Sequence, residues 1–589
     1  MIEDLYRYPL KGFPAQRLEV VDLKVGQGIA GDRALALGFN SQHVEPAGGW
    51  TPCQAFQRMS IRPDLTRYQL DVLDETLRLT SPQLLVEHID EDSKCLVNLA
   101  TNFGEKTPVH RRKEGGGYWD HPDAALSIIN IATIEEIAKT LKRPIAPLQF
   151  RANIYVRAEP WAEFHWLGQS LEIGDARIDI IRPIDRCKTT SVNVDTGELD
   201  VNMPAALQQH FGHMFCGVYA SVRNTGRIGT PAIAQITPSA GQSAVRKAAS
   251  VSTAPSLPHW PRPATICETR HEAEDIKSIW IEDSLSDIGA LSDFKAGQYI
   301  RIHGLGGERI WRSYTVSPVQ EGKLRVTVKR DIGVGSQAMH NLVAGDMVTL
   351  TGPFGEATLR DPCKAIHFVS AGIGITPIIA KLSALAVLKY AGPIVVHHVA
   401  RDPEKLALWD EIEQAAAALP NIELHLYLTQ NTGDRRTAHH GRPNCHAVIE
   451  QANIAQADIH ICGPNGFVRS LDDHIEAANI PRERVFRDSF CSSSVTVNMR
   501  EIAPSPPIKV TLSRSNITDY WRPQDGTLLE FAEKRGVITP SHCRAGICNT
   551  CQCNVIAGAT ERLVGEEGED RVRTLLCTSI PTETLTLDI

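Results

Sequence analysis

The placing of the cysteines limits the folds open to this chain more than any other feature. The sequence holds 14 cysteines, and four of them crowd into residues 543–553. The first residues, MIEDLYRYPLKG, lack the charged and then apolar pattern of a secretory signal, so we expect a cytoplasmic protein. Because thiols stay reduced in the cytoplasm, a dense local group of cysteines indicates bound metal and not disulfides.

The spacing within this group indicates which metal centre it holds. Three of the cysteines follow the pattern C-x4-C-x2-C, and another lies downstream in LLCTSIP, as in plant-type 2Fe-2S sites. A zinc site of four cysteines is the alternative, but its paired C-x2-C knuckles are absent. Cys553 falls outside the pattern and is expected to pack in the core. The predicted cluster ligands are Cys543, Cys548, Cys551 and Cys577.

Length and composition predict several soluble domains. At 589 residues the chain exceeds what one hydrophobic core supports, and no apolar run reaches the roughly 18–20 residues that span a bilayer. A net charge of -8 gives no support for nucleic acid as a partner. Segments 236–262 and 491–507 are rich in Ala, Ser or Pro and are predicted to be linkers.

The part between the two linkers changes character near residue 361. Before this point, short strand-like runs such as LRVTVKR and DMVTLTG alternate with Gly and Pro, which predicts a small antiparallel barrel over 263–360. Over 361–490, apolar strand-like runs alternate with helix-like runs. That alternation predicts a parallel α/β sheet with covering helices.

Several motifs occur in order along these two predicted domains. Arg312-Ser-Tyr-Thr315 is followed by Val328-Lys-Arg330 and by the turn Gly333-Val-Gly-Ser336. A later strand-like run ends in Ala371-Gly-Ile-Gly-Ile-Thr376-Pro377, where a helix opens and a pyrophosphate could approach the backbone. Another ends in Cys462-Gly-Pro. Together these resemble the ferredoxin–NADP reductase superfamily, in particular its members of the phthalate dioxygenase reductase type, which carry a C-terminal 2Fe-2S domain.

This resemblance implies a flavin site and a nicotinamide nucleotide site. FAD and FMN both remain open. Arg401 could meet the 2′-phosphate of NADPH and Asp402 the free ribose hydroxyl of NADH, and we favour NADH. The implied flavin residues are Arg312, Ser313, Tyr314, Thr315, Lys329, Gly335 and Ser336, and the implied nucleotide residues are Gly372, Gly374, Thr376, Cys462 and Gly463.

Four runs in the first 230 residues resemble the MOSC family, which includes molybdenum reductases of the amidoxime reducing component type. They are Tyr8-Pro-Leu-Lys11-Gly12, Gly31-Asp-Arg33, Phe150-Arg-Ala-Asn153 and Asp185-Arg-Cys187. The resemblance implies that Cys187 ligates molybdenum at the catalytic centre, and a soft thiolate suits such a metal. The phosphate of molybdopterin needs cations. The implied cofactor residues are Lys11, Arg33, Arg151, Asn153 and Arg186.

The sequence departs from the MOSC pattern at Ala152, where proline is common, and at Thr230, where aspartate is frequent. The alternative interpretation makes Cys187 a buried thiol and the arginines ordinary surface charges.

The predicted fold of the whole chain is multidomain, with α/β and β parts. Its domains are a MOSC N-terminal β-barrel (1–115), a MOSC molybdenum-cofactor domain (116–235), a linker (236–262), a flavin-binding antiparallel β-barrel (263–360), a parallel α/β NAD(P)-binding domain (361–490), a second linker (491–507) and a β-grasp ferredoxin domain (508–589).

The predicted modules form an electron-transfer chain. Flavin converts the two-electron hydride of NADH or NADPH into single electrons for the cluster, and molybdenum then receives them. The resemblance implies an oxidoreductase for small-molecule N-hydroxylated substrates that needs no separate redox partner. The proton donor is not identified beyond Asp185. Two alternatives are a flavin and iron–sulfur reductase that serves a separate oxygenase, with the MOSC part as a docking module, and a MOSC part that carries molybdopterin without turnover.

Overall fold

The computed structural model describes most of the chain. Two compact units form, one from Met1–Leu257 together with Ser494–Ile589 and the other from Pro258–Ser493. No helix among the described residues has the length and apolar character needed to span a bilayer. The described residues are 1–39, 50–73, 76–103, 107–112, 116–238, 242–251, 259–286, 294–307, 310–320, 322–355, 357–359, 364–430, 438–488, 502–535, 537, 539, 551–563 and 569–589.

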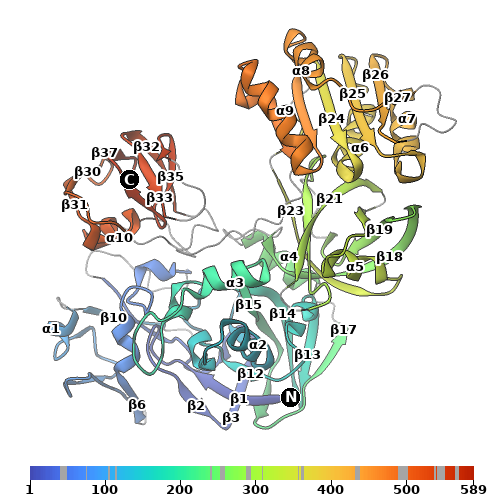
Figure 1. Ribbon diagram of the computed structural model, residues 1–589. Coiled ribbons are helices and arrows are strands. Elements are labelled where there is room, and N and C mark those ends of the chain that lie inside the picture. Colours follow the sequence, from blue (N-terminus) through green and yellow to red (C-terminus); the bar gives the residue numbers. More distant parts are fainter. Residues whose placement is uncertain are drawn as a thin grey trace. The chain divides into compact units, whose positions relative to one another are not determined.

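An open eight-stranded sheet lies at the centre of the N-terminal part (Figure 1), in the order β17-β13-β14-β15-β11-β12-β1-β2. Strand β11 is buried along its whole length, as expected of an apolar strand inside a covered sheet. Asn130 ends β11 and caps helix α2 (Ile131–Leu141) by accepting from the Ala132 amide. The strands are β1 (Ile2–Arg7), β2 (Gln16–Leu18), β11 (Leu126–Asn130), β12 (Ile154–Val156), β13 (Gln169–Ile173), β14 (Ala176–Asp185), β15 (Phe215–Asn224) and β17 (Gln235–Pro238).

The closed barrel predicted for the MOSC part is not confirmed, because the described strands leave this sheet open. Strand β1 pairs with β12, so residues on both sides of the predicted boundary at 115 share one sheet. Three small sheets complete the N-terminal part, in the orders β5-β10-β9, β16-β3-β4 and β6-β7-β8. Their strands are β3 (Val20–Lys24), β4 (Gly28–Ile29), β5 (Leu35–Leu37), β6 (Gln69–Leu73), β7 (Thr76–Thr80), β8 (Val86–Ile89), β9 (Cys95–Leu96), β10 (Thr107–Arg111) and β16 (Gly226–Gly229), and the remaining helices are α1 (Ala100–Phe103) and α3 (Met203–Phe211).

The segment 236–262 differs from the predicted linker. Its first residues pair with β13 as part of β17, and helix α4 (Gln242–Val251) follows. Val245 and Ala248 of this helix are fully buried. The Ala-rich run AVRKAASV therefore packs as a helix, an outcome that alanine's high helix propensity favours.

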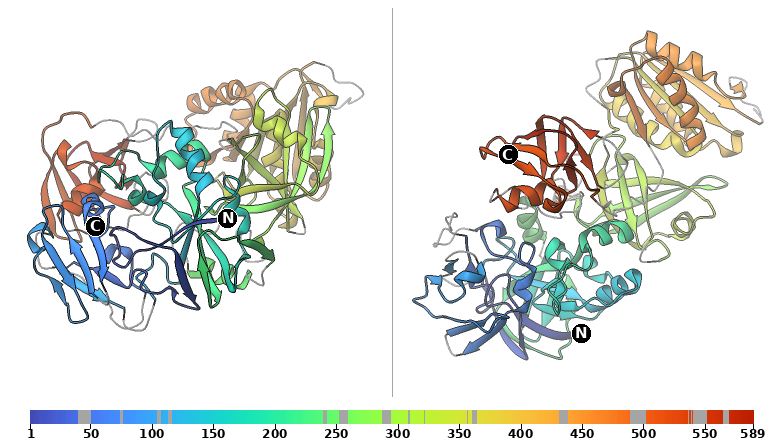
Figure 2. Two further views of the ribbon diagram at one scale, coloured as in Figure 1. Left: turned by 90° about the horizontal axis from the view of Figure 1, so that it is seen from below. Right: turned by 60° about the vertical axis from the view of Figure 1, so that its left-hand side comes forward.

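The antiparallel barrel predicted for the next part of the chain is confirmed as a closed barrel, shown in green to yellow-green in Figure 2. Its strands follow the order β18-β19-β22-β21-β20-β23 around the barrel, and aliphatic side chains such as Ile266, Ile279 and Val326 fill the interior. The elements are β18 (Arg262–Ala273), β19 (Ile276–Asp283), β20 (Tyr299–His303), β21 (Trp311–Gln320), β22 (Lys323–Lys329), α5 (Val334–Asn341) and β23 (Met347–Phe354).

The predicted parallel α/β sheet is also confirmed, in the order β27-β26-β25-β24-β28-β29 with every described pair parallel. Phe368 packs with α6 and α7 on one face, whereas Val369 packs with α8 and α9 on the other (Figure 1). The elements are β24 (Ile366–Ala371), α6 (Thr376–Val387), β25 (Ile394–Ala400), α7 (Trp409–Ala417), β26 (Ile422–Leu428), β27 (His439–His440), α8 (Cys445–Ile454), β28 (Asp458–Cys462), α9 (Asn465–Ala477) and β29 (Val485–Asp488).

The C-terminal part is a mixed sheet with one helix against it. The five-stranded order is β31-β30-β37-β32-β35, and a small sheet has the order β34-β33-β36. Cys553 is buried in the hydrophobic core, as predicted. The elements are β30 (Ile508–Leu512), β31 (Ile517–Trp521), α10 (Leu528–Lys534), β32 (Gln552–Ala557), β33 (Thr560–Arg562), β34 (Glu569–Asp570), β35 (Arg573–Leu575), β36 (Ser579–Pro581) and β37 (Leu585–Leu587).

Candidate functional site

Cys187 lies where the long strand β14 gives way to a single helical turn, Lys188–Ser191. The carbonyl oxygen of Cys187 accepts from the backbone amide and the hydroxyl of Thr190, at 3.1 and 2.9 Å, which fixes this turn. The thiol is partly exposed and lines a cavity of about 200 Å³. The structure thus places Cys187 at the wall of a cavity and not in the core.

The cavity brings together most of the residues predicted from the MOSC resemblance. Lys11, Arg33, Arg151 and Arg186 all line it, although they come from four separate stretches of sequence. Asn153 lies behind the wall, where its side-chain oxygen accepts from the amide and hydroxyl of Ser127 at 3.1 and 2.9 Å. Asn153 therefore holds Ser127, a residue of the cavity wall, and does not itself line the cavity.

Two of the arginines flank one buried tyrosine. The Cζ atoms of Arg33 and Arg151 lie 4.8 and 4.3 Å from the ring centroid of Tyr8, which is 1% exposed. Arg33 and Arg151 also adopt positive φ angles of 50° and 53°. Such backbone strain in residues other than glycine is typical of functional sites. Burial, and then repulsion by Arg33, lower the pKa of Arg151.

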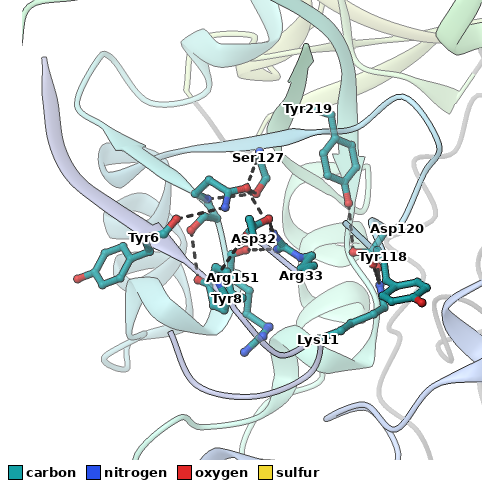
Figure 3. Close-up of polar contacts among 12 residues, drawn as sticks. Tyr6, Tyr8, Lys11, Asp32, Arg33, Tyr118, Asp120, Ser127, Arg151 and Tyr219 are labelled. Carbon is teal, nitrogen blue, oxygen red and sulfur yellow. Dashed lines mark hydrogen bonds and ion pairs between the residues drawn. The ribbon is translucent and has the colours of Figure 1, made fainter. Parts of the chain in front are cut away.

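Lys11 pairs with a carboxylate in the cavity wall (Figure 3). Its Nζ donates to Asp120 Oδ1 at 2.6 Å and to the Tyr118 carbonyl oxygen at 2.7 Å, and the Tyr219 hydroxyl is 3.5 Å from Asp120 Oδ2. Burial opposes ionisation of Asp120, but Lys11 and Arg33 outweigh it and hold the pKa of its carboxyl well below its usual range. Asp120 is therefore a carboxylate that neutralises part of the cationic wall.

Arg186 makes fewer hydrogen bonds than its guanidinium can donate. Its Nε donates to the Cys216 carbonyl oxygen at 2.7 Å and its Nη1 to that of Phe150 at 2.9 Å. Its Nη2 is buried and has no hydrogen-bond partner among the residues that the structure describes. A buried guanidinium donor that lines a cavity suits an anionic ligand, because an unmade hydrogen bond of a charged group is costly.

Three further residues of the cavity wall were missed from the sequence. Arg58 adds a fifth cation, and its Nε donates to the Ser60 hydroxyl at 3.0 Å. His121 and Tyr219 also line the cavity and meet ring edge to ring face, with centroids 5.5 Å apart. None of the three lies in a recognisable motif, so no sequence signal marked them.

The predicted flavin residues lie on one strand and on the helix beside it. The run from Arg312 to Thr315 forms part of β21 and pairs with β20, with Thr315 opposite Tyr299. Gly335 in α5 lies against Arg312: a Cβ there would be 3.0 Å from Arg312 Cγ. The structure thus brings Arg312 and the glycine turn together.

Two of the predicted flavin residues make other contacts. Ser336 donates to the carbonyl oxygens of Asp331 and Gly333, at 3.0 and 2.9 Å, and so closes the turn before α5. The Nζ of Lys329 lies 3.8 Å from an Asp275 carboxylate oxygen. Ser313 and Tyr314 are adjacent on β21, and burial raises the pKa of Tyr314.

The two predicted nucleotide motifs meet at the carboxyl ends of β24 and β28. A Cβ at Gly374 would lie 2.4 Å from the Cys462 carbonyl oxygen, so only glycine allows this approach. Thr376 begins α6, Gly372 has a φ of 57° with open space around it, and Gly463 packs against Ala371. This loop after a parallel strand, opening a helix, is the kind of site at which nucleotides bind.

The structure describes two of the four predicted cluster ligands. Cys551 and Cys577 are buried in one hydrophobic core, and the amide of Leu576 donates to the Cys551 carbonyl oxygen at 3.2 Å. Cys551 therefore lies beside the segment that carries Cys577. Cys543 and Cys548 lie outside the described residues.

Comparison with known proteins identifies four domains. The matching family models are a MOSC domain over residues 113–231, an oxidoreductase FAD-binding domain over 284–359, an oxidoreductase NAD-binding domain over 368–473 and a 2Fe-2S iron-sulfur cluster binding domain over 510–582.

Similar proteins cover about half of this chain or somewhat more. The phthalate 4,5-dioxygenase oxygenase reductase subunit of Pseudomonas putida is 29% identical over 296 residues, which cover 49% of this chain and 85% of that protein. The glycine betaine monooxygenase reductase subunit of Pseudomonas aeruginosa is 25% identical over 52% of this chain and 89% of its own. The NADPH oxidoreductase of Mycobacterium tuberculosis is 29% identical over 63% of this chain and 98% of its own. The chain is therefore an NAD(P)H-dependent oxidoreductase in which a MOSC domain is joined to FAD-binding, NAD-binding and 2Fe-2S domains like those of phthalate dioxygenase reductase.

Proposed function

We propose that this chain is a self-contained molybdenum oxidoreductase that reduces N-hydroxylated compounds to amines or amidines. Electrons pass from NAD(P)H to flavin, then to the 2Fe-2S cluster and then to molybdenum held by Cys187. The substrates are hydroxylamines, amidoximes or N-hydroxy bases. No separate redox partner is needed, because every carrier belongs to one chain.

The charge of the Cys187 cavity is the observation that carries this proposal. Five cationic side chains line it against the carboxylates of Asp120 and Asp185. The buried Nη2 of Arg186 lacks an acceptor among the described residues. A phosphate group with two negative charges supplies that acceptor and offsets most of the surplus positive charge, and arginine is well suited to phosphate. The donor set therefore fits molybdopterin with a thiolate ligand beside it.

The residues of the cavity have different roles in binding the cofactor. Arg33, Arg151 and Arg186 would hold the phosphate of the bound cofactor, and the carboxylate of Asp120 pairs with Lys11 in the cavity wall. The cofactor, when bound, supplies transfer of an oxygen atom and exchange of single electrons. In the overall reaction the N–O bond breaks, two electrons and two protons are consumed, an N–H bond forms and water is released.

The test uses the full chain purified from a host that makes molybdopterin. We expect molybdenum, flavin and two irons per chain, and anaerobic NAD(P)H oxidation when 6-N-hydroxylaminopurine is added. Cys187→Ala should bring this oxidation to background and leave NAD(P)H-driven ferricyanide reduction unchanged, because ferricyanide takes electrons from the flavin module. A chain that contains iron and flavin but no molybdenum would refute the proposal.

A second candidate function is that of a reductase for a separate oxygenase. Two similar proteins are named as reductase subunits of oxygenases, and this likeness favours the second candidate. In that case the MOSC domain is a docking or binding module. This candidate predicts iron and flavin without molybdenum, and electron delivery to an added oxygenase component that the Cys187→Ala variant supports as well as the wild type does.

A further inference from the structure

A histidine and a carboxylate lie close to each other in the wall of the Cys187 cavity. His121 belongs to the loop before β11, and Asp185 ends β14, two residues before Cys187. Nε2 of His121 and Oδ1 of Asp185 are 4.0 Å apart, and their side chains are 14% and 1% exposed. This separation is too long for a direct hydrogen bond. A single oxygen atom, however, can lie within about 2.8 Å of both atoms.

Arg182 decides which nitrogen of His121 carries hydrogen. Its Nη1 lies 3.2 Å from His121 Nδ1, and Arg182 is fully buried within β14. A guanidinium has only donors, so Nδ1 must accept. In the uncharged ring the hydrogen then sits on Nε2, the nitrogen nearer to Asp185.

The surroundings keep this ring uncharged. Burial, and then the positive charge of Arg182, lower the pKa of His121 to about 4, against the opposing effect of Asp185, Asp120 and Asp123. The ring of Tyr219 meets the imidazole at 71° and adds no charge at neutral pH. Near neutral pH the cavity therefore presents an N–H donor and a carboxylate acceptor side by side.

We propose that His121 and Asp185 together recognise the N-hydroxyl group of the substrate, with His121 Nε2–H donating to its oxygen and Asp185 accepting its hydrogen. This inference rests on the proposed function and deepens it. A hydroxyl oxygen both accepts and donates, so it matches the pair. An O-methyl ether lacks the hydrogen that Asp185 accepts, and the product amine lacks the oxygen. The pair thus selects the oxygenated substrate over its product.

Binding without NAD(P)H tests the recognition separately from turnover. The full oxidised holoprotein is titrated calorimetrically with 6-N-hydroxylaminopurine, with its O-methyl ether and with adenine. We expect the hydroxylamino compound to bind about tenfold more tightly than the other two, the effect of one hydrogen bond to a charged group. Equal binding of the hydroxylamino compound and its ether would overturn the inference and leave the proposed function standing.

Variants of His121 separate recognition from structure. His121→Gln places an amide N–H near the position of Nε2 and should keep most of the preference. Asparagine is shorter than glutamine by one methylene, so His121→Asn should lower the preference for the hydroxylamino compound about tenfold. His121→Ala should lower it by the same factor. Molybdenum content should stay equal in the three variants, because His121 is not expected to hold the cofactor. An unchanged preference in His121→Ala would refute the role of His121.

Arg182 acts through His121 and is a positioning residue. In the wild type the affinity for 6-N-hydroxylaminopurine should stay constant between pH 5.5 and 8, since folded His121 is uncharged throughout. Arg182→Met removes the donor to Nδ1 and a nearby positive charge, so the affinity should become dependent on pH below about 6.5, the ordinary pKa of histidine. Arg182→Gln keeps a donor and should behave more like the wild type. A flat profile in Arg182→Met would contradict this role.

Discussion

The Cys187 cavity and the parallel sheet of the NAD-binding domain bury polar side chains in opposite ways. Apart from the uncharged ring of His121, the cavity keeps its ionisable groups charged: arginines and lysine lie opposite carboxylates, and Arg186 still has a donor without a partner in the described structure. The sheet carries a row of histidines on adjacent strands, in which His367 and His397 are buried, His425 is half-buried and His439 is exposed. The rings of His397 and His425 stack with centroids 4.8 Å apart at 12°.

The difference shows what burial of a polar group indicates. Burial lowers the pKa of His367 to about 4 and that of His397 to about 3, helped by the neighbouring His425. These imidazoles fold as uncharged flat rings and serve packing. A buried charge is retained only where partners or a ligand compensate it. The cavity therefore has the charge pattern expected of a binding site, whereas the histidine row has that expected of the scaffold.

The largest expected effect concerns acid and the histidine row. The folded pKa values of His367 and His397 lie below the unfolded value of about 6.5, so their contribution to stability is complete above that pH and is lost as the pH falls below it. At pH 5 the loss should reach about 2 kcal/mol for each histidine, from about 1.36 kcal/mol per pKa unit. Amide hydrogen exchange of β24–β26 at pH 7.5 and pH 5, corrected for intrinsic exchange rates, measures this loss of stability.

Two variants show whether this row causes the acid response. His397→Leu should remove about half of the extra exchange at pH 5, whereas the exposed His440→Leu should leave it unchanged. If wild-type β24–β26 exchanges with the same protection at both pH values, the histidines are charged in the folded protein. The proposed difference between an uncharged histidine row and a charged cavity would then be wrong.

Sequence motifs predicted the parts of the site whose residues are neighbours in the chain. The glycines at 372 and 374 were assigned from their place between a strand and a helix, and the close approach of Gly374 to Cys462 follows from parallel pairing of β24 with β28. The parallel sheet and the closed barrel were predictable for the same reason. Short-range patterns encode local geometry.

The missed parts depend on contacts between distant residues. Arg182 meets His121 across 61 positions of sequence, and a lone histidine in YWDHPD carries no sign of that contact. Helix α4 was missed because its segment reads as Ala- and Ser-rich, while its stability comes from burial of Val245 and Ala248. Tertiary packing decided both, and the spacing of Val245 and Ala248 by three residues is too short a pattern to have distinguished a helix from a linker.

A smaller effect is expected where one cavity arginine is replaced. Arg151→Gln removes a cation that burial and Arg33 make costly, while an amide can still donate to the Phe13 carbonyl oxygen, now 2.7 Å from Arg151 Nη2. We expect molybdenum retention to fall about tenfold, the effect of one lost charged hydrogen bond. The cofactor-free chain should change in stability by less than about 1 kcal/mol. Elemental analysis and thermal unfolding measure the two quantities.

The matched control is Arg157→Gln, at an exposed arginine whose ion pairs with Glu3 and Glu135 lie on the surface. It should leave molybdenum content unchanged. If Arg151→Gln keeps its molybdenum and loses several kcal/mol of stability, Arg151 is a structural residue. The cavity would then resemble the histidine row in serving the scaffold alone.

The smallest expected effect tests the charge state within the row itself. The Tyr427 hydroxyl lies 3.4 Å from His397 Nδ1, a long contact, so Tyr427→Phe should cost no more than about 1 kcal/mol while the ring keeps its stacking. Folded His397 is uncharged at both pH 7.5 and pH 5, so the cost should be equal at the two values. A cost that grows at pH 5 would mean that the folded state protonates His397 there, because Nδ1 of a charged ring always carries a hydrogen and needs the tyrosine oxygen as an acceptor.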